Sequence, residues 1–255
     1  MGRFQDLTVL ITGAAGGFGL KLARRFAAEG ANLVLSDLDA GRLDEATAAF
    51  DTPVATLAGN VADESLSQDL VALAFERFGR LDVAVNNAGI VHDFMKLPQT
   101  PSDVARRVFE VDLLGMFFAL KHQIPALERQ FRDKALPGAI VNMASVAGIA
   151  GAPKLGVYAA AKHGVVGLTR SAAAECATKG VRINAVCPSF ARTAMVTGIL
   201  GSDNPAGEAE LTRGVPMRRL AETDEIAEVV LFAADPKNSF MTGQTLAADG
   251  GITAI

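Results

Sequence analysis

Short apolar runs alternate with longer helical runs along the whole chain, and this alternation restricts the fold more than any other feature. Continuous apolar runs such as Val9-Leu10-Ile11 are typical of parallel strands that are covered on both faces. Strict alternation of strand and helix predicts right-handed crossovers and a doubly wound parallel sheet of about seven strands with helices on both faces, an α/β fold. Strands are expected at 8–12, 32–36, 54–58, 82–86, 139–144, 182–187 and 245–248, and helices at 18–29, 39–50, 64–78, from about 101 past 120, 158–179 and 223–234.

The composition is that of a globular chain with a sizeable core. Half of the 255 residues are hydrophobic, the net charge is −4, and no linker-like change in composition occurs, so we expect one domain over residues 1–255. The absence of a basic block and of a membrane-length apolar run argues against nucleic-acid and membrane partners. The polar start at 1–6 does not resemble a signal peptide, and Cys176 and Cys187 fit reduced, packed thiols, so a cytoplasmic protein is expected. The least patterned segment, about 189–215, is expected to be a substrate loop.

A glycine-rich turn, Thr12 to Gly19, joins the first expected strand to the first expected helix. Glycines allow the backbone to approach a pyrophosphate, and the helix N-terminus offers free N–H groups. Asp37 ends the second strand eighteen residues after Gly19. A carboxylate there can accept hydrogen bonds from the adenosine ribose and would repel a 2′-phosphate. Since no Arg or Lys occurs at 12–19 or 36–41, the sequence predicts a Rossmann-like site that prefers NAD over NADP.

The single tyrosine of the chain, Tyr158, stands four residues before Lys162 in an Ala-rich helical stretch. Residues i and i+4 share one face of a helix, so the ammonium can stabilise the phenolate and lower the pKa of the tyrosine. A tyrosine of that kind can exchange a proton near neutral pH. Taken alone, the spacing also fits a half-exposed tyrosine beside a solvated lysine. Motifs elsewhere in the chain are needed to distinguish a catalytic from a structural role.

Five motifs that occur in one order resemble the short-chain dehydrogenase/reductase family, and the resemblance covers essentially the whole chain. They are the glycine turn, Asn86-Asn87-Ala88-Gly89, Ser145, Tyr158-x-x-x-Lys162 and the segment Pro188 to Thr193. The resemblance implies that Tyr158 is the general acid/base and that Lys162 lowers its pKa and holds the nicotinamide ribose. It also implies that Ser145 binds the substrate oxygen.

The resemblance assigns the cofactor contacts as well. Asn60 and Val61 stand where the family contacts adenine, and Asn60 keeps a carbonyl acceptor where the family more often has Asp. Ser189 replaces the glycine that often follows the proline. The implied cofactor-binding residues are Gly13, Gly17, Phe18, Gly19, Asp37, Leu38, Asn60, Val61, Asn87, Ala88, Gly89, Tyr158, Lys162, Pro188 and Thr193.

Asp112, the fourth catalytic candidate, departs from the family, which usually has Asn at this position to help hold a water beside the lysine. A carboxylate accepts the same hydrogen bonds but cannot donate an amide N–H, and it can pair electrostatically with Lys162. We therefore expect an active enzyme with an altered pH profile.

The pocket walls are expected at 91–95, 146–155 and 190–215, which are mostly apolar. Such a pocket favours a secondary alcohol or ketone with a hydrophobic or cyclic body. The substrate-binding candidates are Ser145, Tyr158, His92, Ile149, Leu155 and Met195. For the pocket-wall residues among them, simple packing is an equally good explanation.

The sequence is also compatible with other functions, and it does not determine the oligomeric state. A sugar or polyol dehydrogenase, a 3-hydroxyacyl dehydrogenase and a non-catalytic dinucleotide-binding protein are the alternatives. His92, His122 and His163 lack metal-ligand spacing, so no metal is expected. The family resemblance implies a homotetramer or a dimer.

Overall fold

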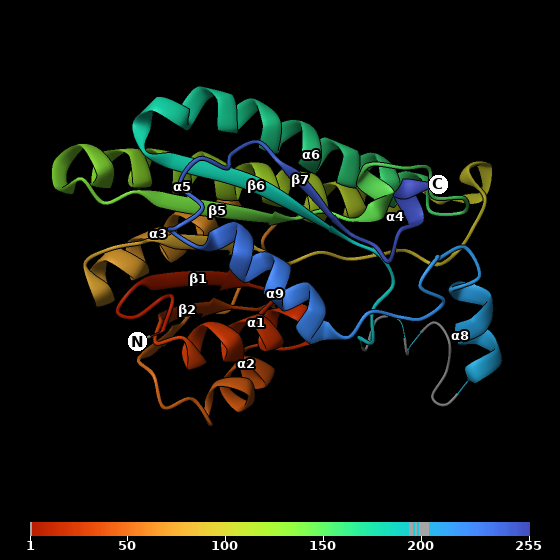
Figure 1. Cartoon of the computed structure of the whole chain (residues 1–255), viewed down its shortest axis with the longest axis horizontal. Coiled ribbons are helices and arrows are strands. Elements are labelled where there is room, and N and C mark those ends of the chain that lie inside the picture. The colour runs from red at the N-terminus through yellow and green to blue at the C-terminus, as the bar shows by residue number, and fades with distance from the viewer. Residues whose placement is uncertain (1, 194–195, 197, 199–203) are drawn as a thin grey trace.

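The computed structural model describes residues 2–193, 196, 198 and 204–255. Its sheet has seven parallel strands in the order β3-β2-β1-β4-β5-β6-β7 (Figure 1). The strand order reverses between β1 and β4, and such a switch point is where ligands bind in doubly wound folds. The strands are β1 (Thr8–Thr12), β2 (Asn32–Ser36), β3 (Val54–Thr56), β4 (Val83–Asn86), β5 (Gly138–Met143), β6 (Val181–Pro188) and β7 (Thr245–Ala248).

Helices cover both faces of the sheet, as predicted (Figure 1). Alternate residues of a strand point to opposite faces, so Val9 and Ile11 pack in one cluster with α1 and α9, while Leu10 packs in a second cluster with α3, α5 and α6. The helices are α1 (Gly17–Ala28), α2 (Ala40–Thr47), α3 (Glu64–Phe78), α4 (Ser102–Phe109), α5 (Gly115–Lys134), α6 (Gly156–Cys176), α8 (Pro205–Leu211) and α9 (Thr223–Ala234).

The long helix expected from about residue 101 is not continuous. A π-helical turn, η2 (Glu110–Leu114), separates α4 from α5. A π-turn shifts the hydrogen-bond ladder by one residue, and residue periodicity over so short a stretch does not reveal it.

The expected substrate loop at 189–215 contains the short helix α8. Pro205 stands at its first position, and Asn204 caps it by accepting from the Gly207 N–H. Arg192, in the segment after β6, holds α8 through two hydrogen bonds to Glu208 of 2.7 and 3.0 Å. Seven residues are too few for a periodic sequence signal, which is why the helix was not predicted.

No helix among the described residues combines the length and the apolar character that crossing a membrane requires.

Candidate active site

A cleft opens at the carboxyl ends of β4, β5 and β6, beside the first turns of α6. It holds a cavity of about 190 Å³. Carboxyl ends of parallel strands meet at one edge of a sheet, so residues distant in the sequence come together there. The predicted site residues that line this cleft are Phe18, Asn87, Gly89, Asp112, Ser145, Leu155, Tyr158, Lys162, Pro188 and Thr193.

Lys162 and Asp112 form a buried ion pair in this cleft. The Lys162 Nζ lies 3.1 Å from the Asp112 Oδ2, and the two side chains are 5% and 0% exposed. The Asp112 Oδ1 accepts from the Ile90 N–H at 2.8 Å, and the Lys162 ammonium donates to the Met143 carbonyl at 3.2 Å. The pair therefore joins η2, the segment after β4, the end of β5 and α6.

Lys162 keeps its charge despite burial. Burial is the largest single influence and lowers its pKa, but the charges of Asp112 and Tyr158 and the hydrogen bond to Asp112 together outweigh it, so the pKa of Lys162 is raised. The ammonium lies 5.6 Å from the centre of the Tyr158 ring. A cation at this distance stabilises negative charge on the phenol.

Gly89 makes room for the ion pair. A Cβ at this position would stand 3.2 Å from the Lys162 Nζ and 3.3 Å from the Asp112 Oδ2. The glycine thus lets the backbone after β4 approach both charged groups, and any side chain there would displace them.

Ser145 follows the end of β5 in extended conformation. Its hydroxyl accepts from the Ala147 N–H at 3.2 Å and so caps a short 3₁₀ turn, Val146–Gly148. The buried thiol of Cys187, on β6, adjoins the Ser145 backbone. Burial raises the pKa of Cys187 to about 11, so the thiol is protonated at neutral pH.

The glycine turn after β1 forms a close-packed cradle. A Cβ on Gly19 would lie 1.9 Å from the Gly13 oxygen, and Gly13 itself has a φ of +66°. The Asn87 amide donates to the carbonyls of Thr12 and Gly13 at 2.9 and 3.2 Å. Gly16 and Gly17 leave the backbone without side chains at the N-terminus of α1, which suits a pyrophosphate. The residues present fit a dinucleotide.

Asp37 is held at the same edge of the sheet. Its carboxylate accepts from the Ala15 N–H and from the Leu38 N–H, both at 2.8 Å. The structure adds one residue that the sequence did not reveal: an Arg42 guanidinium nitrogen lies 3.0 Å from where a Gly16 Cβ would stand. Arg42 directly follows the segment 36–41, which has no basic residue, and the docking of α2 brings its side chain to the turn.

Several predicted residues lie outside the lining of the cleft. His92 is 7% exposed and its Nδ1 donates to the Asp93 carbonyl, while its Nε2 has no hydrogen-bond partner in the part of the chain that is described. Ile149 packs against the core cluster of α5 and α6. The Asn60 side chain accepts from the Ala62 N–H at 3.1 Å. Met195 lies outside the described residues.

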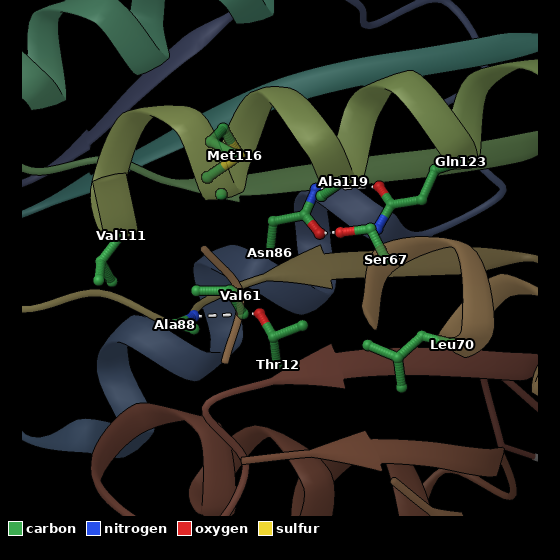
Figure 2. A pocket seen from close by; sticks show the side chains of 11 residues that line it. Thr12, Val61, Ser67, Leu70, Asn86, Ala88, Val111, Met116, Ala119 and Gln123 are labelled. Carbon is green, nitrogen blue, oxygen red and sulfur yellow. Dashed lines mark hydrogen bonds between the residues drawn. The ribbon is translucent and has the colours of Figure 1, made fainter. Parts of the chain in front are cut away.

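The residue Val61, expected near adenine, lies outside the cleft. It lines a small cavity between β1, β4, α3 and α5 together with Thr12 and Ala88 (Figure 2). The Thr12 hydroxyl accepts from the backbone N–H groups of Asn87 and Ala88 at 3.1 Å each. This contact ties the turn after β4 to the glycine turn after β1.

The walls of the cleft are apolar, as the sequence indicated. They are formed from three separate segments, which contribute Ile90, Val91, Phe94, Val146, Leu155, Phe190 and Val196. Among the described residues, no cluster of three or more His, Cys, Asp or Glu side chains is arranged to hold a metal ion.

Comparison with known proteins gives consistent matches over the full chain. The model of a family described as enoyl-(acyl carrier protein) reductase matches residues 13–253. A trans-4-hydroxycyclohexanecarboxylate dehydrogenase of Sinomonas cyclohexanicum is 40% identical, over 99% of this chain and 95% of the relative. The crystal structure of levodione reductase superposes with a TM-score of 0.93 at 36% identity and 99% coverage of both chains. The structure of ElxO with NADP bound has a TM-score of 0.90 at 30% identity and covers 98% of this chain and 99% of its own.

Proposed function

The chain belongs to the short-chain dehydrogenase/reductase family, and from this premise we propose that it is an NAD-dependent dehydrogenase that interconverts a cyclic secondary alcohol and its ketone. The observation that carries the proposal is the cleft in which Ser145, Tyr158 and Lys162 meet between apolar walls. A cyclohexane ring is the substrate body named for the similar dehydrogenase of Sinomonas cyclohexanicum. Such a ring suits walls that bear Phe94 and Phe190.

Each polar group has a separate task in the proposed reaction. Ser145 hydrogen-bonds the substrate oxygen and orients it, and Tyr158 takes the hydroxyl proton during oxidation and returns it during reduction. Lys162 stabilises the phenolate with its retained charge. When bound, the nicotinamide ring supplies the acceptor or donor of the hydride. The third N–H of Lys162 is available to hold the nicotinamide ribose.

Turnover tests the proposal directly. Purified protein should form NADH, followed by its absorbance, with cyclohexanol and with 4-hydroxycyclohexanecarboxylate but not with a linear polyol. Tyr158→Phe should lower kcat by about 10³-fold or more because the proton acceptor is lost. Tight NAD binding without NADH from any alcohol would favour a non-catalytic dinucleotide-binding protein. A higher kcat/KM for a 3-hydroxyacyl thioester would mean that the substrate is an acyl chain and not a cyclic alcohol.

The preference for NAD rests on Asp37. Its carboxylate is fixed by two backbone N–H groups, and a fixed anion at this edge of the sheet would repel a 2′-phosphate while accepting from ribose hydroxyls. Arg42 opposes this preference, because its guanidinium lies against the glycine turn. We expect NAD to be preferred and some activity with NADP to remain.

Two variants separate these contributions. Asp37→Ser should lower kcat/KM for NAD and raise it for NADP, whereas Arg42→Gln should lower it for NADP alone. Wild-type protein that prefers NADP would contradict the role of Asp37, as would an Asp37→Ser variant with unchanged selectivity.

We propose that the protein is a homotetramer or a dimer. It would act on a small molecule in the cytoplasm and would bind neither nucleic acid nor membrane. The assembly is supported by Leu114 and Phe117, which are 44% and 42% exposed where η2 passes into α5. Light scattering after size-exclusion chromatography tests it: Phe117→Glu should shift the wild-type oligomer to a smaller species. A monomeric wild type would contradict the assembly.

A further inference from the structure

A chain of buried polar side chains runs along one face of the sheet, between strands β4 and β5 and the helices α5 and α6 that cover them. It runs from Gln123 on α5 through Asn86 on β4 and Asn142 on β5 to Thr169 on α6. These side chains are 3%, 3%, 0% and 0% exposed, respectively. We refer to these four residues as the polar spine.

Hydrogen bonds connect each member of the polar spine to the next. The Asn86 amide donates to the Gln123 Oε1 and to the Asn142 Oδ1, both at 3.0 Å, and the Gln123 amide donates to the Asn86 Oδ1 at 2.7 Å. Figure 2 shows Asn86 and Gln123 facing each other below α5. The Asn142 amide donates to the Thr169 hydroxyl at 2.9 Å, and this hydroxyl donates to the Val165 carbonyl at 2.8 Å.

Two members of the spine are adjacent in the chain to residues of the cleft, and the other two lie on helices that carry or follow the ion pair. Asn86 precedes Asn87, which binds the glycine turn, and Asn142 precedes Met143, whose carbonyl accepts from Lys162. On α6, Thr169 follows Lys162 by about two helical turns. Gln123 lies on α5, which continues from the π-turn that carries Asp112.

Apolar packing alone does not fix the position of α5 and α6 relative to β4 and β5. Apolar contacts are non-directional, so a helix can shift along a sheet at small cost. Hydrogen bonds between buried amides have directions, and a satisfied network of this kind selects one arrangement because any shift leaves a polar group unpaired. The spine lies on β4 and β5, on α6, which carries Lys162, and on α5, which follows the π-turn of Asp112.

We propose that Gln123, Asn86, Asn142 and Thr169 are positioning residues that set where the Lys162–Asp112 pair lies relative to the ends of β4 and β5. The expected loss of kcat rests on the proposed function. The expected movement of the ion pair does not depend on which reaction the cleft catalyses. A displacement of about 1 Å at a reacting centre suffices to lower the rate strongly.

Gln130 provides a matched control. It is also on α5, is also 3% exposed, and also makes two hydrogen bonds, to the Leu81 N–H at 3.0 Å and the Leu81 carbonyl at 2.8 Å. Leu81 precedes β4, at the end of the sheet opposite the cleft. Loss of the Gln130 bonds therefore reports the cost of removing a buried amide without disturbing the spine.

The experiment compares Gln123→Met, Thr169→Val and Gln130→Met in the full-length protein, at a temperature where all three are folded. Gln123→Met and Thr169→Val should lower kcat about tenfold and shift the pH–rate profile, with KM for NAD changed less than about threefold. Gln130→Met should lower the melting temperature similarly but change kcat less than about twofold.

Crystal structures of the same variants give a second readout that does not depend on turnover. The Lys162 Nζ should move relative to the Met143 carbonyl in the two spine variants and stay in place in Gln130→Met. If wild-type protein oxidises no alcohol, the proposed function fails while this comparison still decides the inference. An unmoved ion pair, or equal loss of kcat in Gln130→Met, would show that the spine contributes stability only.

Discussion

At the scale of single residues, Asp112 is the side chain that most distinguishes this site, because it places a carboxylate 3.1 Å from the Lys162 ammonium. In Asp112→Asn the ammonium would act on the phenol of Tyr158 without compensation, so the acid limb of the oxidation profile should move to lower pH. The alkaline limb should move down too, since burial lowers the pKa of Lys162 once the carboxylate is gone. We expect shifts of about one unit with activity retained.

Initial rates of wild type and Asp112→Asn between pH 5 and 11 measure this effect, with a constant saturating alcohol concentration. Superimposable profiles would exclude Asp112 from tuning the site. An upward shift of either limb would mean that the carboxylate acts by something other than its charge.

The residues that could be identified from the sequence are those whose spacing is set by one helix or one turn. Tyr158 and Lys162 share a helical face, and the glycine turn has its own local pattern. Arg42 and the polar spine were not predicted, because their partners are brought to them by the packing of separate elements. His92 looked like a pocket residue from its neighbours, yet it is not part of the lining of the cleft.

At the scale of elements, the Arg182 side chain caps the carboxyl end of α9. The Arg182 guanidinium donates to the carbonyls of Ala233, Ala234, Asp235 and Met241. These carbonyls have no helical partner, so Arg182→Met should lower the free energy of unfolding by about 2–4 kcal/mol. Urea denaturation measures it.

The exposed Arg129→Met on α5 is the matched control for that loss, and it should change the free energy of unfolding by less than about 0.5 kcal/mol. Similar losses in both variants would mean that the methionine, not the missing cap, destabilises the protein.

The amino end of α9 should respond to pH. Glu225 accepts from Arg219 at 2.7 Å and from the Glu222 N–H at 2.8 Å, and these bonds, that to Arg219 first, lower the pKa of Glu225 to about 2. A carboxyl whose pKa falls on folding stabilises the fold above its unfolded pKa and loses this effect as pH falls toward the folded value. The contribution of Glu225 is thus complete above about pH 5 and declines from there toward pH 2.

The difference in melting temperature between wild type and Glu225→Gln should therefore shrink from pH 6 to pH 3. Glu76→Gln, at an exposed position of α3, serves as the reference. A difference that stays constant over this range would contradict the assigned hydrogen bonds.

The element boundaries show where local sequence suffices. The limits of β1, β2 and α3 agree with those expected, and Gly79 ends α3 in a left-handed conformation. The interruption at η2 and the short helix α8 were not predicted, because each spans too few residues to give a periodic pattern.

At the scale of the whole molecule, charged side chains join the start of the chain to α1 and α9. Arg3 pairs with Glu29 and Glu228, and Arg25 pairs with Glu228 and Asp224. Exposed pairs contribute little singly and are screened by salt. We expect Glu228→Gln, which removes the shared partner, to lower the unfolding free energy by less than about 1 kcal/mol.

The dependence on salt concentration distinguishes the loss of the Glu228 ion pairs from a loss of packing contacts. Raising NaCl from 0.05 to 1 M should reduce the difference between wild type and Glu228→Gln in urea denaturation. A difference that persists at high salt would assign it to contacts other than charge.

The alternation of strands and helices predicted the seven-stranded parallel sheet and its two helical faces, because these follow from periodicities that every segment repeats. The prediction of one domain stays a prediction. Cofactor preference and assembly could not be derived in the same way, since they depend on small differences between opposing charges and on surfaces that another molecule would cover.

The π-turn also makes the site sensitive to the length of the chain. An α-helix advances about 100° per residue, so deleting Leu113, between Asp112 and α5, would allow α4 and α5 to merge into one regular helix. The buried side chains of α5, among them Met116, Leu120 and Leu127, would keep that helix in place. The preceding helix would then rotate and carry the carboxylate away from the lysine. A codon lost at this point, with every side chain of the site still encoded, would remove the ion pair as effectively as a substitution.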